Sequence, residues 1–412
     1  MAVTGSITTR FIDETGLDLG KTLIEKDYLI SVYPNIVNQL DTPMLMGWGL
    51  GTSGQLGDNT ATSKSSPVQT IAYGNNWKQI SSGAYTCAGI KTDGTLWLWG
   101  ANDQGQIGDN TTTARSSPVQ TVAFGSNWKQ VIVRGGSITT FVAAIKNDGT
   151  LWCWGNNTNG QLGDNTVTKR SSPVQTVAFG TNWKQVSAGN AGNTYHNTAA
   201  IKTDGTLWVW GDNVNGQLGD NTASNKRSSP VQTVAFGTSW MQVAVGNGHL
   251  AATKNDGSMW TWGGNINGQL GDNTSLGKSS PVQTVTYDKN WKQISCGDNS
   301  AFTCATKTDG TLWCWGLNSS GQLGDNTATN KSSPVQTIAD GTNWKQVSAG
   351  GANCGAIKTD GTLWMWGFGT SGQLGDNTVT SKSSPVQTVI GGNNWKSVSA
   401  DLVTFAIKDG DI

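Results

Sequence analysis

The stretch Gly216-Gln-Leu-Gly-Asp-Asn-Thr222 decides the fold, because the chain of 412 residues contains seven copies of it. Each copy is followed by Ser-Ser-Pro-Val-Gln-Thr, by a Trp and by an Asp-Gly pair. The spacing of 51 to 56 residues exceeds that of a repeat built from one pair of helices. The copies, one of which has Ile in place of Leu, begin at Gly54, Gly105, Gly160, Gly216, Gly268, Gly321 and Gly372.

Each repeat contains four short β-type runs separated by Gly, Asn, Asp or Ser, and no stretch of helical length lies between them. The Asp148-Gly149 pair predicts a two-residue turn, because its central positions tolerate positive φ. The last two runs of the repeat therefore form a hairpin. In the second copy the expected strands, taken in this order as one unit, are Pro118–Phe124, Trp128–Val133, Phe141–Lys146 and Thr150–Gly155.

The last run of each repeat is apolar on both sides. Side chains alternate along a strand, so Trp152 and Trp154 face one side while Leu151 and Cys153 face the other. A four-stranded sheet with two apolar faces must be covered on both, and seven such sheets packed radially cover one another. We therefore predict an all-β fold, a seven-bladed β-propeller of four-stranded blades, preceded by a short, partly helical segment.

The two ends of the repeat array predict how the ring closes. The array begins with a single last-strand motif in which Leu45, Met46 and Trp48 occupy the usual positions, and it ends after three strands without a fourth. We expect the stretch from residue 45 to residue 49 to pair with Val403–Lys408 and to complete the last blade. This divides the chain into an N-terminal docking segment, residues 1–43, and a propeller, residues 44–412.

Composition excludes several partners. Lys and Arg number 27, as do Asp and Glu, and the pI is near 6.7, so no net charge favours nucleic acid. We expect no membrane span and no classical signal peptide, because no apolar run is long enough. Free thiols are expected at Cys87, Cys153, Cys296, Cys304, Cys314 and Cys354, whose spacing matches neither a zinc motif nor a disulfide framework.

Catalytic groups are sparse in the sequence. Both Glu residues, Glu14 and Glu25, precede the propeller, and the two histidines, His196 and His249, lie in different repeats. The repeated Asp residues are of two kinds, one before Gly in the Asp-Gly turn and one in Gly-Asp-Asn-Thr, and each kind occurs seven times. A structural role in turns explains the second kind better than calcium binding. We expect no catalytic residues, no metal and no cofactor, and thus a protein that is not an enzyme.

The repeat resembles a known family. The pattern Trp-Gly-x-Asn-x-x-Gly-Gln-Leu-Gly, seen from Trp210 to Gly219, is similar to the regulator of chromosome condensation repeat, as are Pro-Val, seen at Pro173-Val174, and Val-Ser-Ala-Gly, seen at Val186–Gly189. The resemblance covers residues 44–412. It implies a seven-bladed propeller closed by a blade that both chain ends share, but it does not imply the function after which the family is named.

If the repeats are scaffold, specificity lies where they differ. The longer intervals place insertions at Arg134–Phe141 and Asn190–Thr198, with smaller variation at Ala223–Arg227 and Asp298–Phe302. The two insertions follow equivalent strands in neighbouring blades, so they are expected on one face of the ring. The candidate partner-binding residues are Arg134, Phe141, Tyr195 and His196; the alternative is drift in loops that tolerate change.

Residues 1–43 differ from the repeats. Apolar residues recur there at helical spacing and predict an amphipathic docking stretch that either covers the propeller or attaches it to a larger assembly. The sequence from Asp18 to Pro34 resembles the N-terminal leader segments of virion structural proteins from contractile-tailed phages. The candidate docking residues are Leu23, Ile24, Tyr28, Tyr33 and Ile36.

These features favour a non-enzymatic structural and interaction propeller. On this hypothesis it is a virion component, in a phage tail or capsid, that contacts other structural proteins through residues 1–43 and presents loops to an unidentified protein or glycan on one face. Its location is then the virion. One alternative is a surface adhesin that binds a glycan or a protein, and another is a GTPase-binding protein that resembles an exchange factor.

Overall fold

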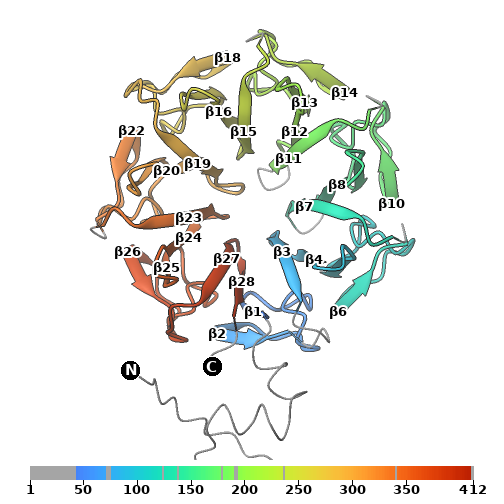
Figure 1. Ribbon diagram of the computed structural model, residues 1–412, viewed down its shortest axis with the longest axis vertical. Helices are drawn as coiled ribbons and strands as arrows, with labels where there is room; N and C mark the ends of the chain where they lie inside the picture. Colours follow the sequence, from blue (N-terminus) through green and yellow to red (C-terminus); the bar gives the residue numbers. More distant parts are fainter. Residues whose placement is uncertain are drawn as a thin grey trace, which may run out of the picture.

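The computed structural model describes residues 43–70, 76–122, 125–136, 139–177, 180–189, 194–234, 237–338 and 341–409. These residues form 28 β-strands and no helix, arranged as seven four-stranded antiparallel sheets around a central axis (Figure 1). No helix that could cross a membrane occurs in this part of the chain. The predicted seven-bladed all-β propeller is confirmed, whereas the expected helical stretch and its docking residues lie outside the described residues.

Every blade runs from an innermost strand, which starts with Trp, to an outermost strand, which contains Ser-Ser-Pro-Val-Gln. The first strands are β3 (Trp77–Ser82), β7 (Trp128–Arg134), β11 (Trp183–Gly189), β15 (Trp240–Val245), β19 (Trp291–Cys296), β23 (Trp344–Ala349) and β27 (Trp395–Ser399). The second strands are β4 (Thr86–Lys91), β8 (Phe141–Lys146), β12 (Asn197–Lys202), β16 (His249–Lys254), β20 (Phe302–Lys307), β24 (Asn353–Lys358) and β28 (Val403–Lys408). The third strands are β5 (Leu96–Gly100), β9 (Leu151–Gly155), β13 (Leu207–Gly211), β17 (Met259–Gly263), β21 (Leu312–Gly316), β25 (Leu363–Gly367) and β1 (Met44–Gly49). The fourth strands are β6 (Arg115–Gln120), β10 (Arg170–Gln175), β14 (Arg227–Gln232), β18 (Lys278–Gln283), β22 (Lys331–Gln336), β26 (Lys382–Gln387) and β2 (Lys64–Gln69).

The grouping of strands into blades corrects one expectation. The Pro-Val strand was expected to begin a blade, but β6 pairs with β5, so it ends the preceding blade. The reason is that the long Gly-Gln-Leu-Gly-Asp-Asn connection folds back beside the strand that it follows. We number the blades 1 to 6 from β3–β6 to β23–β26, and the closing blade contains β27, β28, β1 and β2.

The closing blade joins the two ends of the array, and the predicted pairing of the first strand with Val403–Lys408 is confirmed. It takes two strands from each end and not the expected three and one, because β2 also belongs to this blade. Strand β1 pairs with β28 in antiparallel register, from Met44 opposite Lys408 to Gly49 opposite Val403. Trp48 is fully buried, its ring centroid lies 6.2 Å from that of Trp395, and its indole nitrogen donates to the Gln373 carbonyl at 2.9 Å. The closing blade therefore repeats the packing of the other blades.

The hydrophobic core lies between blades. One face of blade 1, with Ile90 and Leu98, packs against Trp128, Val131 and Trp154 of blade 2. The opposite face of blade 2, with Leu151 and Cys153, packs against blade 3, which confirms the predicted alternation. A large aromatic side chain in this position buries about 150–250 Å². Each interface is thus an apolar layer that holds neighbouring blades at a fixed angle.

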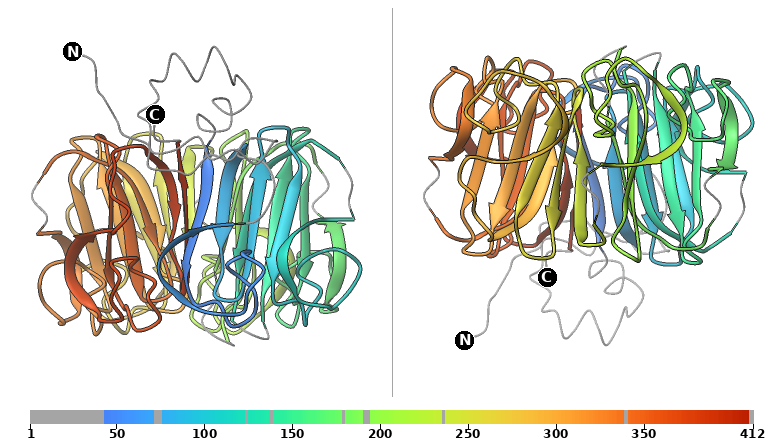
Figure 2. Two further views of the ribbon diagram at one scale, coloured as in Figure 1. Left: turned by 90° about the horizontal axis from the view of Figure 1, so that it is seen from below. Right: turned by 90° about the horizontal axis from the view of Figure 1, so that it is seen from above.

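The strand direction gives the ring two different faces (Figure 2). We call the loop face the one that carries the connections between first and second strands and between third and fourth strands. We call the turn face the opposite one, which carries the Asp-Gly turns and the connections from blade to blade. Strand β1 starts at the turn face, because Met44 lies opposite Lys408 at the end of β28.

Candidate functional site

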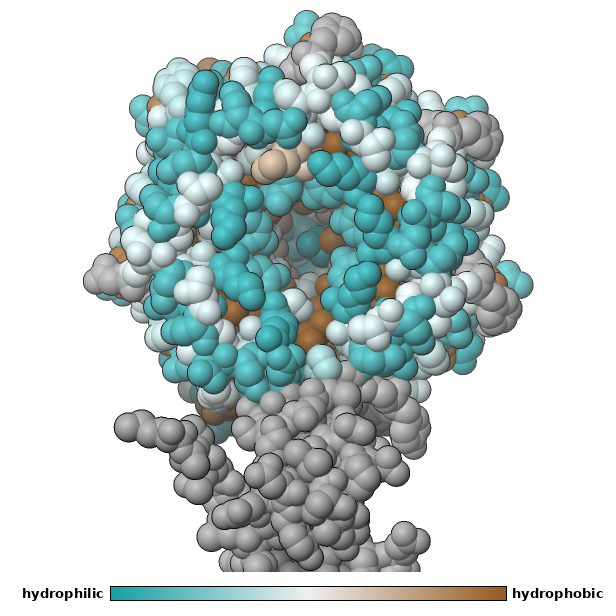
Figure 3. Space-filling view, in the orientation of Figure 1, coloured by the Kyte–Doolittle hydropathy of each residue, from teal (hydrophilic) through white to brown (hydrophobic). Residues whose placement is uncertain are grey.

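The repeated residues of the turn face are occupied by contacts within each blade. Lys146 Nζ lies 4.9 Å from the ring centroid of Trp128 and 4.7 Å from that of Trp152. Asp148 Oδ1 accepts hydrogen bonds from the backbone nitrogen and the hydroxyl of Thr150, which lower the pKa of this carboxyl. Figure 3 shows this face as hydrophilic side chains around a central hollow. These contacts recur around the ring, so the turn face is uniform.

The repeated Gly-Asp-Asn-Thr connection of the loop face is also structural. Asn157 donates to the Thr166 and Thr168 carbonyls at 3.1 Å and accepts from the Leu162 backbone nitrogen at 3.0 Å. Asp164 accepts from Thr166 and from Arg170. Burial raises the pKa of this carboxyl, but these hydrogen bonds and the Arg170 charge outweigh burial and leave it below its usual value. Such a carboxylate is suited to hold the connection and not to transfer a proton.

The loops of the loop face converge on the axis, where they bring three charged side chains together. Arg134 Nε lies 3.6 Å from Asp298 Oδ2, and the guanidinium donates to the Ser82 and Val133 carbonyls. Asp401, from the closing blade, is fully buried; burial and the nearby Asp298 raise its pKa, while Arg134 opposes this shift. Because these side chains come from separate blades, the charge cluster ties the ring together across its centre.

A pocket of about 720 Å³ opens on the loop face between blades 3, 4 and 5. Tyr195 and Asn215 of blade 3 line it on one side, Asn299 of blade 5 lines the other, and blade 4 contributes Asn247 and Gln269 between them. Its volume is within the range of small-ligand sites. We call it the loop-face pocket, and the rest of its lining consists of Val214, Ala223, Gly264, Asn265, Ile266, Asn267, Ser275, Gly277, Ser279, Ser300, Ala301 and Leu317.

The structure separates the four candidate partner-binding residues. The described parts of both insertions, residues 134–136, 139–141 and 194–198, lie on the loop face, as predicted, since they stand between β7 and β8 and between β11 and β12. Phe141 and His196 are fully buried, with ring centroids 6.5 Å apart, and Arg134 lies in the charge cluster. Only Tyr195 of the four is half-buried at a cavity, where it lines the loop-face pocket. The accessible part of the predicted patch is therefore Tyr195.

Sequence reasoning missed the blade-4 and blade-5 sides of the pocket. The signal was present in the smaller variable segments, because Ala223 and the stretch from Asn299 to Ala301 both line the cavity. A stronger signal is Gly264, since every other repeat has a side chain at this position; these are Leu50, Ala101, Asn156, Asp212, Leu317 and Phe368.

The second histidine is not placed for acid–base chemistry. His249 is fully buried, and burial lowers its pKa to about 4. Its Nε2 lies 3.0 Å from the Thr303 hydroxyl. The ring is therefore neutral at physiological pH and acts as a hydrogen-bonding core residue.

Comparison with protein families gives a match over most of the propeller. Residues 133–412 match the RCC1-like domain, and residues 45–90 and 93–142 match the regulator of chromosome condensation (RCC1) repeat. The chain belongs to the RCC1 repeat family. Proteins of this family with related sequences include the ultraviolet-B receptor UVR8 of Arabidopsis thaliana, which is 30% identical over 84% of this chain and 78% of the receptor. The mitochondrial RCC1 domain-containing protein RUG3 of the same plant is 28% identical over 83% of this chain and 81% of RUG3.

Solved structures share the RCC1 fold. Human WBSCR16 superposes with a TM-score of 0.77 at 18% identity, over 90% of this chain and all of that chain. The yeast protein Prp20, whose structure was determined together with its binding to Gsp1p and histones, gives a TM-score of 0.77 at 18% identity over 90% of this chain and 92% of that chain. RCC1-like propellers are in general binding or exchange-factor proteins and not enzymes.

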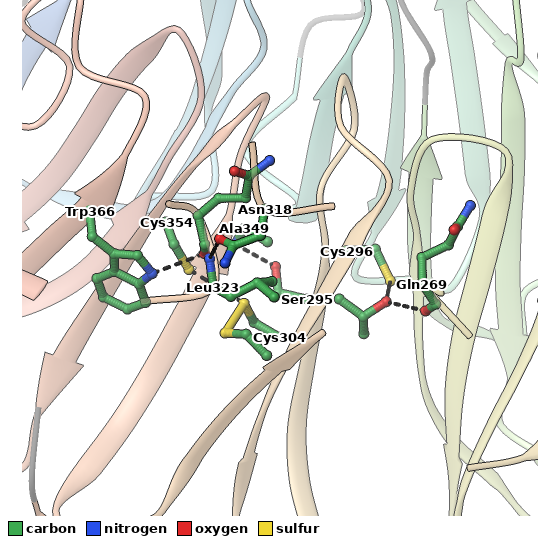
Figure 4. Close-up of a disulfide and its surroundings, with 12 residues drawn as sticks. Gln269, Ser295, Cys296, Cys304, Asn318, Leu323, Ala349, Cys354 and Trp366 are labelled. Carbon is green, nitrogen blue, oxygen red and sulfur yellow. Dashed lines mark hydrogen bonds between the residues drawn. A yellow bond between two sulfur atoms is a disulfide. The ribbon is translucent and has the colours of Figure 1, made fainter. Parts of the chain in front are cut away.

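The cysteines of this RCC1 propeller correct one expectation (Figure 4). Cys304 and Cys314 form a disulfide, because they lie directly opposite each other on β20 and β21 with Cα atoms 4.1 Å apart. The sulfur of Cys354 in blade 6 lies 3.7 Å from that of Cys304. The prediction of free thiols is wrong for this pair, while Cys87, Cys153, Cys296 and Cys354 are free and buried.

Proposed function

We propose that this chain is a non-enzymatic interaction propeller that binds its partner at the loop-face pocket. The observation that supports this proposal best is the contrast between the pocket and the ring around it. The pocket has about 720 Å³ of space, and it opens at blade 4, where Gly264 has no side chain although the residue at this position has one in every other repeat. The turn face is uniform by comparison, so a partner that recognises one part of the ring finds a distinct surface at this pocket.

The opposite face suits attachment. Residues 1–42 precede Pro43 in the sequence, and the described chain enters the ring at Met44 on the turn face. A partner on the loop face and an assembly on the turn face would then not compete for the same surface. We propose that Leu23, Ile24, Tyr28, Tyr33 and Ile36 dock the propeller onto other structural proteins.

We further propose that this assembly is a virion, such as a phage tail or capsid. The support for this is the resemblance of residues 18–34 to leaders of virion structural proteins. The family relationship is compatible with the proposal, because Prp20, which has the same fold, binds the proteins Gsp1p and histones.

The test separates attachment from binding. A virus that encodes only residues 44–412, which include every strand of the ring, should yield a soluble, folded propeller that is absent from purified virions. A second virus carrying Tyr195→Ala should incorporate the protein normally but lose partner binding. Normal incorporation of the shortened chain would refute docking by residues 1–43, and unchanged partner binding of the Tyr195 variant would remove the pocket from the proposal.

A further inference from the structure

We infer that the loop-face pocket binds an uncharged saccharide. This inference rests on the proposed function, because it names the ligand class of the same pocket. Three properties of the pocket support it: the absence of charge in its lining, hydrogen-bonding groups that lack a partner, and apolar side chains at its rim.

The first property is neutrality. None of the described residues that line the pocket is charged, although Lys, Arg, Asp and Glu make up 13% of the whole chain. A phosphate, a carboxylate or an ammonium group would enter without a counter-charge, at a considerable desolvation penalty. The lining therefore selects a neutral ligand.

The second property is hydrogen-bonding capacity. Gln269 is only 2% exposed, and its side-chain oxygen accepts from the Asn267 backbone nitrogen at 2.9 Å. No described residue pairs with its side-chain nitrogen, which is also true of Gln55, Gln217, Gln322 and Gln373 at the equivalent position, whereas Gln106 donates to Thr86 and Gln161 donates to Asn156. What distinguishes Gln269 is its place in the wall of the pocket, where its side-chain nitrogen can donate to a ligand that supplies an acceptor.

Two further carboxamides extend this capacity. The side chain of Asn215 makes no hydrogen bond to any described residue, and its nitrogen lies near Gly248. Asn247 donates to the Asn299 carbonyl at 2.9 Å, which orients its own carbonyl oxygen as a free acceptor. Carboxamides offer a donor and an acceptor in one plane, and neighbouring sugar hydroxyls both donate and accept. The pattern therefore fits a polyhydroxylated ligand.

The third property is a partly apolar rim. Ile266 is 84% exposed and Val214 is 49% exposed, and both line the pocket. The other repeats carry polar residues at this position: Thr52, Asp103, Thr158, Ser319 and Thr370. Together with the ring of Tyr195, these side chains present apolar surface next to the carboxamides. A pyranose ring has the matching character, with C–H faces flanked by hydroxyls.

The space for the ligand comes from two glycines of blade 4. A Cβ at Gly264 would lie 3.5 Å from the Asn215 side-chain nitrogen, at ordinary contact distance, so larger residues are compatible with the backbone there. Gly277 likewise replaces residues with side chains, which are Ser63, Ala114, Lys169, Asn330 and Ser381 in other repeats. A larger residue at position 264 would occupy the pocket without disturbing the strands.

The experiment uses the full chain and an array of neutral and anionic oligosaccharides, followed by titration of each binder in solution. We expect at least one neutral oligosaccharide to bind. Gly264→Leu, which introduces the residue that blade 5 has at Leu317, should weaken binding by at least about tenfold, and Ile266→Thr should weaken it by several-fold. Val379→Thr is the matched control, because Val379 is 59% exposed on the loop face of blade 6 and lies outside the pocket.

Each outcome decides a different statement. Binding of only anionic sugars, or of no sugar, overturns the ligand class; if Gly264→Leu then still abolishes partner binding, the proposed function stands and a neutral peptide becomes the ligand to test. A sugar that binds the wild type and Gly264→Leu equally overturns the assignment to this pocket. Loss of sugar binding in the Val379→Thr control would show that the effects are not specific to the pocket and would overturn the assignment as well.

Discussion

Replacing Arg134 with Met tests whether the buried charge cluster holds the ring together across its axis. The change removes the cation next to Asp298 and Asp401, which are 2% and 0% exposed, and it removes the donor to the Ser82 and Val133 carbonyls. Removing one partner of a buried ion pair destabilises a protein by about 3–5 kcal/mol. With an unfolding entropy of about 2.1 cal/mol/K per residue over roughly 370 residues, ~4 kcal/mol lowers Tm by about 5 °C.

The pH dependence of this effect has a definite sign. The fold raises the pKa of Asp401, so Asp401 contributes stability below its unfolded pKa of about 3.9, and this contribution is lost as pH rises through the folded value. Without Arg134 the folded pKa rises further. Urea unfolding should therefore show a larger loss for Arg134→Met at pH 8 than at pH 5, and Asp401→Asn in the same variant should reduce that difference.

A surface ion pair provides the control for this prediction. Lys289 lies 3.7 Å from Asp256, and the two side chains are 68% and 51% exposed. Lys289→Met should cost at most about 1 kcal/mol, because exposed pairs contribute little. The reasoning is refuted if Arg134→Met unfolds at the same urea concentration as the wild type at pH 8, or if it costs no more than Lys289→Met.

Three further changes test the scaffold. Trp48→Ala and Trp154→Ala remove equivalent buried indoles from the closing blade and from blade 2, so each should cost about 3–5 kcal/mol in urea unfolding; a clearly smaller cost for Trp48 would mean that the closing blade is not formed. Asn157→Ala leaves buried backbone groups without partners and should cost about 1–3 kcal/mol, measured in the same way; a neutral effect would contradict the role assigned to that network. Alkylation of the denatured, unreduced protein should label four cysteines by mass spectrometry, and labelling of six would contradict the Cys304–Cys314 disulfide.

The sequence predicted the architecture well because one local pattern recurs. The alternation around Trp154 and the Asp-Gly turn specify a hairpin with two apolar faces, and such a sheet has few ways to bury both. It was harder to predict which strand of the repeat begins a blade. The connection after Gly155 is long, and its return to the same sheet depends on hydrogen bonds made by Asn157 and Asp164. The order of strands along a repeat does not by itself show where a blade begins.

The site was predicted only in part. Insertions located the loop face, but insertion length does not reveal burial, and Phe141 and His196 are core residues. The pocket depends instead on missing side chains, and an absence such as Gly264 becomes visible only when all repeats are compared position by position. The disulfide was also missed, although the sequence contains the signal for it. Cys304 and Cys314 are equidistant from the turn residue Asp309, so the hairpin register places them opposite each other.

Hydrogen–deuterium exchange of the segment Met44–Gly49 tests the central claim most directly, because a closed ring requires this strand to pair with Val403–Lys408. The account predicts slow exchange for these amides, comparable to that of Leu151–Gly155, the equivalent strand of blade 2. Exchange of Met44–Gly49 within seconds, while Leu151–Gly155 stays protected, would contradict the account. The two ends of the array would then be apart, and an open ring would not hold the charge cluster and the pocket in place.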